Sequence, residues 1–333
     1  MLNPARLLAV PALSALLLAP LSGCAGLDTR LPSIAAADLK AEKQAQEKLA
    51  LTEWDEMAGR LIRVGRPILL ANQGLCPKTG PNIGVFTHEE ENYEKRLRGG
   101  ARRELGVGED TEIFHIAPDS PAAKIGLKRG DIIRNADGDD LDMRDIQKAL
   151  EDKKRLTLDR GEDKLPLRVT PDMACAYRLR LKQSSDVNAY ADGRNITVTT
   201  GMMTFVENDE ELALIVGHEL AHNTMGHIRK IIGNFILSGF ATRYTRPFES
   251  EADYVGLYYS RRAGYGVDGV EDFWRRLAKT EPRHVGRAKT HPTFPDRYLR
   301  LAAARAEIKA KEEAGEPLVP NFKTSDSKSG NAS

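Results

Sequence analysis

Residues 208–224 read NDEELALIVGHELAHNT, and the rest of the chain is interpreted outward from this stretch. Asn208 and Glu211 stand three residues apart and form a capping-box-like pair, which predicts that a helix begins here. His218 and His222 follow four residues apart, so their side chains project from the same helix face. Two imidazoles on one face can bind a single metal ion. We therefore expect a metal site on this helix.

A carboxylate stands beside the two histidines. Glu219 lies one residue round the helix from His218, where it can reach a water on the metal but not the metal itself. Bound zinc lowers the pKa of water, and a carboxylate placed in this way can take the proton while hydroxide attacks a peptide carbonyl. Because a single H-E-x-x-H pattern also arises by chance, further ligands are needed to support a zinc peptidase.

A second motif, Glu249-Ser250-Glu251-Ala252-Asp253, falls within a helix predicted over 247–263. It resembles the E-x-x-A-D motif of HtpX-like and CAAX-prenyl-protease-like gluzincins, and the resemblance extends over most of residues 186–300. It implies one zinc ion per chain with Glu249 as the third ligand. Asp253, four residues later on the same face, is placed to hydrogen-bond a ligating histidine. Glu251 points about 160° away from Glu249 and is therefore the weaker ligand candidate, with a solvated helix face as the alternative.

The sequence on either side of these motifs also resembles the same family. It includes NAYADGRNITVTTGMM at 188–203, whose strand with Ile196 and Val198 is expected to be the edge that receives substrate as an added strand. Downstream, His291-Pro292 with Arg297 resembles the family's H-P motif, whose histidine can reach the zinc in a periplasmic branch of the family. This implies that His291 is a switchable fourth ligand of a latent enzyme, and a loop histidine packed near the site is the alternative. Arg297 either orients that loop or stabilises a developing oxyanion.

The other histidines lack the spacing of metal ligands. His227 follows His222 by five residues, and in a single helix over 208–237 it would point about 140° away from the metal face. We interpret it as structural. The remaining three, which we interpret as surface or packing residues, are His88, His115 and His284.

The N-terminus predicts export and lipid anchoring. An n-region ends at Arg6, and the apolar, proline-broken run 7–21 suits a signal peptide better than a membrane-spanning helix. Leu21-Ser22-Gly23-Cys24 resembles a bacterial lipobox, in which the thiol of Cys24 accepts diacylglycerol and anchors the chain. An ordinary N-terminal anchor is the alternative. The chain is thus expected on the periplasmic side of a bacterial membrane, with the outer membrane favoured because Ala25 is not an aspartate.

Two further cysteines, Cys76 and Cys175, remain after Cys24. In an oxidising periplasm such a pair predicts one disulfide, which would join the segment before the middle region to the start of the metal-binding region. The alternative is two buried free thiols.

Residues 120–133, SPAAKIGLKRGDII, closely resemble the bacterial PDZ signature. The resemblance implies a small β-rich domain that binds peptides. Leu105, Gly106 and Val107 are the candidates for its carboxylate-binding loop, although the first glycine of the family's loop is missing. The alternative is a PDZ domain that only positions or shields the active site. The elements predicted around the signature are a strand at 111–117, a helix at 143–151 and a hairpin at 155–169.

The composition is that of a globular protein, with 41% hydrophobic and 29% charged residues, and the net charge of +1 gives no electrostatic reason to expect nucleic-acid binding. An early helix is predicted from Asp38 to Arg66, where Pro67 should end or kink it. The fold class is α+β, with a mostly helical zincin domain that has a small edge sheet, plus the PDZ domain. The expected divisions are a signal peptide (1–23), a tether and helix (24–77), the PDZ-like domain (78–170, entered through an irregular segment at 77–100), the metallopeptidase domain (171–315) and a disordered tail (316–333).

These features together predict a zinc metalloendopeptidase that serves protein quality control in the cell envelope. Its partners would be unfolded or misassembled proteins or peptides, and the membrane through the lipid anchor. A PDZ-centred adaptor or chaperone-like protein with little turnover is the main alternative, although Glu219 argues against it because a purely structural metal site needs no general base. A metal-delivery protein is disfavoured by ligands placed on buried helices.

Overall fold

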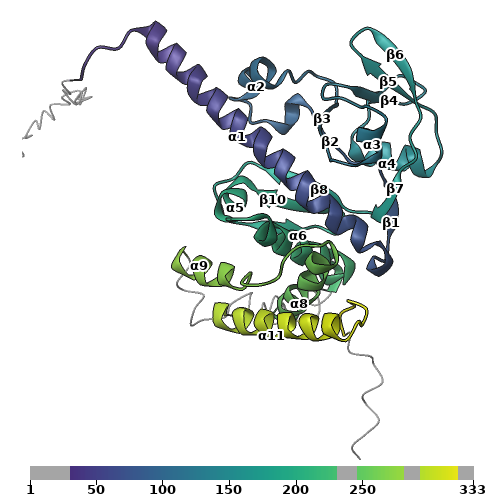
Figure 1. The fold of residues 1–333 in the computed structure, drawn as a ribbon. Helices are drawn as coiled ribbons and strands as arrows, with labels where there is room; N and C mark the ends of the chain where they lie inside the picture. Colours follow the sequence, from purple (N-terminus) through teal and green to yellow (C-terminus); the bar gives the residue numbers. More distant parts are fainter. Residues whose placement is uncertain (1–30, 231–245, 281–292, 322–333) are drawn as a thin grey trace, which may run out of the picture. The chain divides into compact units, whose positions relative to one another are not determined.

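The computed structural model describes residues 31–230, 246–280 and 293–321 (Figure 1). Cys24 of the predicted lipobox, His284 and His291 lie outside the described residues, as do the predicted signal peptide and the end of the predicted tail. The chain divides into two compact units, Met1–Glu42 and Lys43–Ser333, and the site described below belongs to the second. None of the described helices is both long and apolar enough to span a bilayer.

A long first helix, α1 (Ala36–Ala71), contributes to the main hydrophobic core. Its residues Leu61, Val64 and Ile68 are fully buried and repeat every three to four positions. Pro67, predicted to end or kink the helix, lies inside it, so the helix does not end there. A proline removes one backbone donor, and burial of the turn that contains Ile68 stabilises the continuation.

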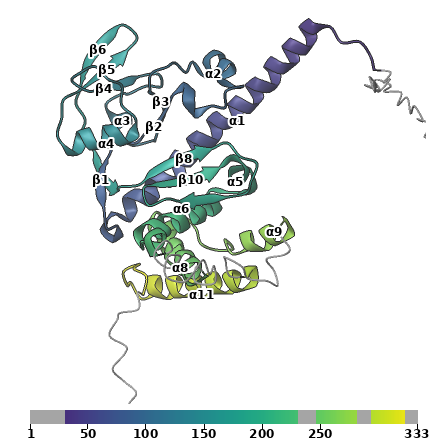
Figure 2. The ribbon, with the colours of Figure 1, turned by 180° about the vertical axis from the view of Figure 1, so that it is seen from behind.

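The central sheet has the strand order β8 (Arg178–Lys182), β10 (Asn195–Thr199) and β9 (Ala189–Ala191). Strand β10 runs parallel to β8 and antiparallel to β9. In both views α1 lies on one side of these strands and α6 (Asp209–Thr224) on the other (Figures 1 and 2). Side chains of all three layers belong to one hydrophobic core. Because both faces are covered, all five residues of β10 are buried.

The helix that carries the histidine pair begins where its sequence predicts. The side chain of Asn208 accepts a hydrogen bond of 2.9 Å from the backbone N–H of Glu211. The helix ends at Thr224, earlier than predicted, because Gly226 adopts a left-handed conformation (φ 66°) that an α-helix does not contain. The neighbouring helices are α5 (Thr200–Phe205), α8 (Arg246–Arg262), α9 (Asp272–Thr280) and α11 (Phe294–Glu313).

A second hydrophobic core lies in the strand-rich middle region, where Ile113, Ile133 and Leu158 are among its buried residues. The strand, helix and hairpin predicted there are all present. The PDZ assignment itself stays a prediction. The elements are β2 (Val85–His88) paired with β3 (Glu112–Ile116), the sheet of β4 (Ile132–Arg134), β5 (Leu156–Arg160) and β6 (Asp163–Leu167), and the helices α3 (Pro121–Lys124) and α4 (Met143–Glu151).

The entry to this region is more regular than its composition predicts. The segment 77–100, expected to be irregular, contains two strands, β1 (Thr79–Asn82) and β2. Strand β1 pairs antiparallel with β7 (Asp172–Cys175). Glycine and proline in β1 hide the strand from its sequence because their preference for turns is overridden by the pairing with β7. Cys76 and Cys175 form a disulfide beside this pair, with Cα atoms 5.6 Å apart. A short 3-10 helix, η1 (Gln73–Leu75), precedes the segment, and a second, η2 (Glu90–Asn92), lies within it.

The expected carboxylate-binding loop proves to be the end of a helix. Helix α2 (Arg98–Leu105) stops at Gly106, whose φ of 75° caps it. Leu105 and Val107 pack into a small core with Leu51 of α1 and with Tyr93. These side chains therefore attach α2 to α1 and are not arranged to receive a peptide.

Candidate metal centre

Helices α6 and α8 bring three potential metal ligands together. Nε2 of His218 lies 3.0 Å from Nε2 of His222, and each of these nitrogens lies 3.5 Å from a carboxylate oxygen of Glu249. In a tetrahedral zinc site with bond lengths of about 2.0–2.1 Å, neighbouring ligand atoms lie about 3.3 Å apart. All three residues are buried, with 6–7% of their surface exposed. This donor set therefore fits zinc.

Two glycines set the distance between α6 and α8. A Cβ on Gly217 would lie 2.4 Å from the carbonyl oxygen of Gly256, and a Cβ on Gly256 would lie 2.6 Å from the backbone nitrogen of His218. Both distances are well below van der Waals contact. The hydroxyl of Ser260 also donates a 2.8 Å hydrogen bond to the carbonyl oxygen of Ala213, across the two helices. This close approach allows one helix to add a carboxylate to the two imidazoles of the other.

A buried ion pair lies behind His218. Its Nδ1 is 2.9 Å from Oδ1 of Asp253, and Arg297 donates two hydrogen bonds, of 2.6 and 2.7 Å, to the same carboxylate. Burial alone would raise the pKa of Asp253, but the guanidinium of Arg297 and the bond to His218 hold that pKa below its ordinary value. The guanidinium also stacks on Trp274 at 3.5 Å from the ring centroid. Arg297 thus orients Asp253, a role that its sequence position did not indicate.

Glu219 is a buried carboxylate on the same helix as the two histidines. Its surface is 6% exposed, and it lines the cleft together with His218, His222 and Glu249. Burial raises the pKa of Glu219 above its ordinary value, although the two imidazoles oppose this shift. A carboxylate with a raised pKa is a stronger base and is suited to take a proton from water in this cleft.

Sequence reasoning missed the contacts of His222. Its Nδ1 lies 3.1 Å from Nδ1 of His227, and Nε2 of His227 lies 2.8 Å from Oε2 of Glu251. His227 is fully buried. It was interpreted as pointing away because α6 was expected to continue, whereas the turn at Gly226 brings it back beside His222. The glycine just before the histidine is the signal that could have shown this.

The cleft, of about 470 Å³, opens beside strand β9 and not beside β10. Val187 to Ala191 line it, and among the described strands β9 pairs with β10 alone, so its outer edge faces the cleft side. Ile196 and Val198 belong to the interior strand β10 and have no exposed surface. The prediction that they form the substrate-binding edge is therefore wrong. Their β-branched pattern identifies a strand but does not give its position in the sheet.

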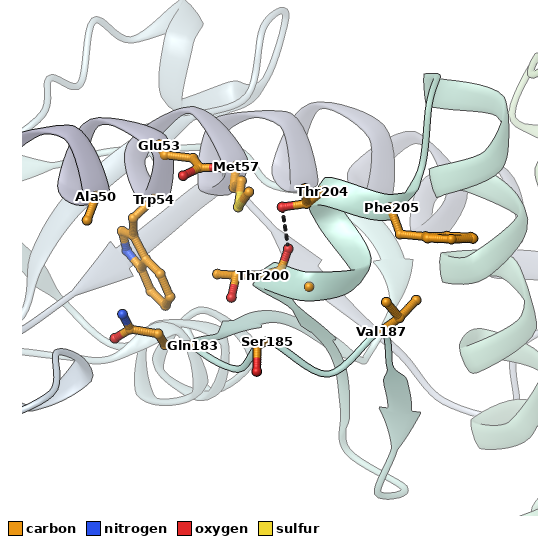
Figure 3. Close-up of a pocket in the computed structure, with 11 residues that line it drawn as sticks. Ala50, Glu53, Trp54, Met57, Gln183, Ser185, Val187, Thr200, Thr204 and Phe205 are labelled. Atoms are coloured by element: carbon orange, nitrogen blue, oxygen red, sulfur yellow. Dashed lines mark hydrogen bonds between the residues drawn. The ribbon is translucent and has the colours of Figure 1, made fainter. Parts of the chain in front are cut away.

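A second cavity, of about 550 Å³, adjoins this cleft (Figure 3). Trp54 and Met57 of α1 face Thr200 and Thr204 of α5, and Val187 and Phe205 lie toward the other end (Figure 3). Val187 lines both the second cavity and the cleft. Because Val187 stands just before β9, the second cavity lies at the N-terminal end of that strand.

Comparisons with known proteins agree with this geometry. Residues 171–236 and 228–307 match the model of peptidase family M48. Mitochondrial metalloendopeptidase OMA1 of Schizosaccharomyces pombe is 22% identical over 181 residues, which cover 44% of this chain and 54% of the relative. Beta-barrel assembly-enhancing proteases of Yersinia pestis and of Escherichia coli are each 24% identical over 169 and 168 residues, covering 39% of this chain and 34% of the relative.

The chain spans about a third to a half of the length of these curated relatives, so their similarity concerns mainly the metal-binding region. That region holds the H-E-x-x-H helix, the glutamate of α8 and the cleft between them. Its match to the family and the names of its relatives both denote metal-dependent proteolysis. Residues 171–307 are thus similar to peptidase family M48, and the arrangement of their site is that of a metalloprotease.

Proposed function

We propose that this chain is a zinc-dependent endopeptidase of the bacterial cell envelope that degrades unfolded or misassembled proteins. The observation that carries the proposal is the composition of the cleft, in which the three potential metal ligands and the carboxylate of Glu219 lie beside the outer edge of β9. A site that only binds metal for structural reasons needs neither a general base nor a strand edge.

Some residues of the site would bind the metal ion, and another would transfer protons. His218, His222 and Glu249 would hold the zinc ion. A zinc ion bound there polarises a carbonyl group and lowers the pKa of water. Glu219 then takes the proton from the attacking water and delivers it to the leaving amine. Asp253 keeps the ring of His218 in the tautomer whose Nε2 is free to bind metal.

An extended polypeptide is the substrate that the cleft favours. The outer edge of β9 offers backbone N–H and C=O groups to a strand added alongside it. Ala189 and Ala191 have small side chains, and both line the cleft with Glu219. Only a segment without secondary structure of its own can bind in this way. The site therefore selects unfolded chains by backbone conformation more than by side chain.

The strand-rich middle region supports a PDZ-type role in binding peptides or in regulating access. Among the described strands β2 pairs with β3 alone, and a groove between β2 and α4 is lined by Ile83, Val85 and Ile146. Gly84 lines the same groove with φ of 81°, and we propose it in place of Gly106 as the glycine of the carboxylate-binding loop. Because the cavity measures only about 40 Å³, we expect peptides to bind weakly unless the groove widens.

The location follows from different evidence. The lipobox ending at Cys24 supports an anchor on the periplasmic side, in the outer membrane rather than the inner. The disulfide between Cys76 and Cys175 supports an oxidising compartment. Relatives named beta-barrel assembly-enhancing protease support a role in the quality control of envelope proteins.

The test compares the purified full-length chain with its Glu219→Gln variant. We expect one zinc ion per chain in both proteins by elemental analysis. Cleavage of an unfolded casein should fall at least 10²-fold in the variant, since general base catalysis contributes about 10²–10⁴-fold. Absence of stoichiometric zinc from the wild-type chain would refute the proposal. Equal and negligible cleavage by both zinc-loaded proteins would favour the adaptor function over the protease.

A further inference from the structure

His222 has only one ring nitrogen left for the protein when the other faces the metal. Its Nε2 points toward Nε2 of His218 and the carboxylate of Glu249, at 3.0 and 3.5 Å. Its Nδ1 points instead at Nδ1 of His227, at 3.1 Å. With Nε2 bound to metal and the ring neutral, the proton of His222 must be on Nδ1, because a neutral imidazole carries one proton.

This assignment fixes the protons along the whole chain of contacts. Nδ1–H of His222 donates to Nδ1 of His227, which must therefore be an unprotonated acceptor. The proton of His227 is then on Nε2, which donates to Oε2 of Glu251 at 2.8 Å. Each contact thus has one donor and one acceptor, and the chain ends on a carboxylate that is 39% exposed.

The same histidine is also tied to the helix of the third ligand. The ring of His227 stacks on Phe248 with centroids 4.9 Å apart, and Phe248 and Glu251 lie on either side of Glu249 in α8. Since His227 contacts His222 on one side and α8 on the other, any displacement of its ring changes both the orientation of His222 and the position of the turn that presents Glu249.

We propose that His227 and Glu251 are positioning residues for the metal site, which orient His222 as Asp253 orients His218. This inference rests on the proposed zinc site and assigns to it a second set of residues that orient a ligating histidine. The two sets differ in construction. Asp253 is buried and held by Arg297, whereas Glu251 is partly exposed and acts through an imidazole. Loss of such a partner lowers metal affinity by about 10–100-fold in zinc proteins.

The experiment measures metal binding by the full-length chain and its variants. Zinc affinity is determined by competition with a chromogenic chelator, and the geometry of the ligands is followed through the visible absorption bands of the cobalt(II)-substituted protein. His227→Phe replaces the imidazole by another aromatic ring that can stack on Phe248, and removes both nitrogens. Glu251→Ala removes the final acceptor, and Glu251→Gln retains an acceptor oxygen without the charge.

A matched control is available in His88, which is buried, pairs with Glu112 at 3.1 Å and stacks on Phe114 at 4.0 Å, away from the metal site. We expect zinc affinity to fall about 10–100-fold in His227→Phe, with altered cobalt bands. Glu251→Ala should show a smaller loss that Glu251→Gln largely restores. His88→Phe should bind both metals as the wild type does.

Wild-type affinity and unchanged cobalt bands in His227→Phe would overturn the inference while leaving the proposed protease intact, provided that the wild type binds zinc. If His227→Phe fails to fold, the partly exposed Glu251 provides the decisive pair. Equal zinc affinity in Glu251→Ala and the wild type would then overturn it. A wild-type chain without zinc would instead refute the proposed function itself.

Discussion

The crossing of α6 and α8 gives the most demanding test of how this fold builds its site. In Gly256→Ala the new Cβ would lie 2.6 Å from the backbone nitrogen of His218 and 2.7 Å from its Cα. Favourable contacts between such atoms begin at about 3.5 Å, so the helices must separate by about 1 Å. Backbone atoms cannot rotate aside as a flexible side chain does. The displacement therefore acts directly on the helix that carries two ligands.

The size of the effect follows from two opposing contributions. Overfilling a close-packed core costs about 1–3 kcal/mol, and replacing glycine by alanine within a helix contributes about 0.5–1 kcal/mol in the other direction. The free energy of unfolding should therefore fall by up to about 2.5 kcal/mol. A 1 Å separation also lengthens the 2.9 Å contact between His218 and Asp253 beyond a hydrogen bond. Zinc affinity should consequently fall by about 10–100-fold.

Urea unfolding of the chelator-treated protein and competition for zinc measure the two effects separately. The control is Gly99→Ala in α2, where the nearest atom to a new Cβ is a guanidinium nitrogen of Arg103 at 3.8 Å. This change should leave zinc affinity intact and keep or slightly increase the free energy of unfolding. If Gly256→Ala unfolds at the wild-type urea concentration and binds zinc equally well, the glycine crossing does not determine the site.

Three further changes address other parts of the structure. Arg297→Lys keeps the charge but loses the two-pronged contact with Asp253, so zinc affinity should fall about tenfold and urea unfolding should show a loss of about 1–3 kcal/mol; wild-type values would show that charge alone is sufficient. Replacing Cys76 and Cys175 together by serine opens a loop with a sequence separation of 99 residues, and should cost about 2–5 kcal/mol. A reducing agent should destabilise the wild type but not this variant. Thr204→Trp fills the second cavity, and should raise KM for peptides long enough to extend past β9 while leaving short peptides unaffected; equal KM for the long peptides would exclude the cavity from substrate binding.

The histidine pair shows what the sequence could predict. A helix of 3.6 residues per turn places His218 and His222 on one face wherever that helix lies in the protein. The cap at Asn208 likewise depends on neighbouring residues alone, and its hydrogen bond to Glu211 is present in the structure. Glu249 differs because it reaches the site from another helix. Its position was inferred from resemblance to a family and not from periodicity.

The errors share a physical cause, which is that local pattern does not give tertiary position. The sequence predicts that Ile196 and Val198 form a strand, but the place of that strand inside the sheet depends on its pairing with β8 and β9. A helix that continues through Gly226 would point His227 away from the metal site, but the chain turns at that glycine. Gly106 was interpreted as a loop glycine although it ends a helix. In each case the residue type was informative, but the local sequence did not give the residue's neighbours in space.

The construction of the site also bears on the choice between protease and adaptor. Burying a carboxylate is unfavourable unless it is paired, and burial indeed raises the pKa of Glu219. Asp253 is also a buried carboxylate, but its contacts with Arg297 and His218 offset the cost of burial. Its presence is explained by the orientation that it gives to a metal ligand. Glu219 has no such explanation in holding metal, since Glu249 completes the triangle with the two histidines. Its retention in the cleft is therefore accounted for by proton transfer, which only the protease requires.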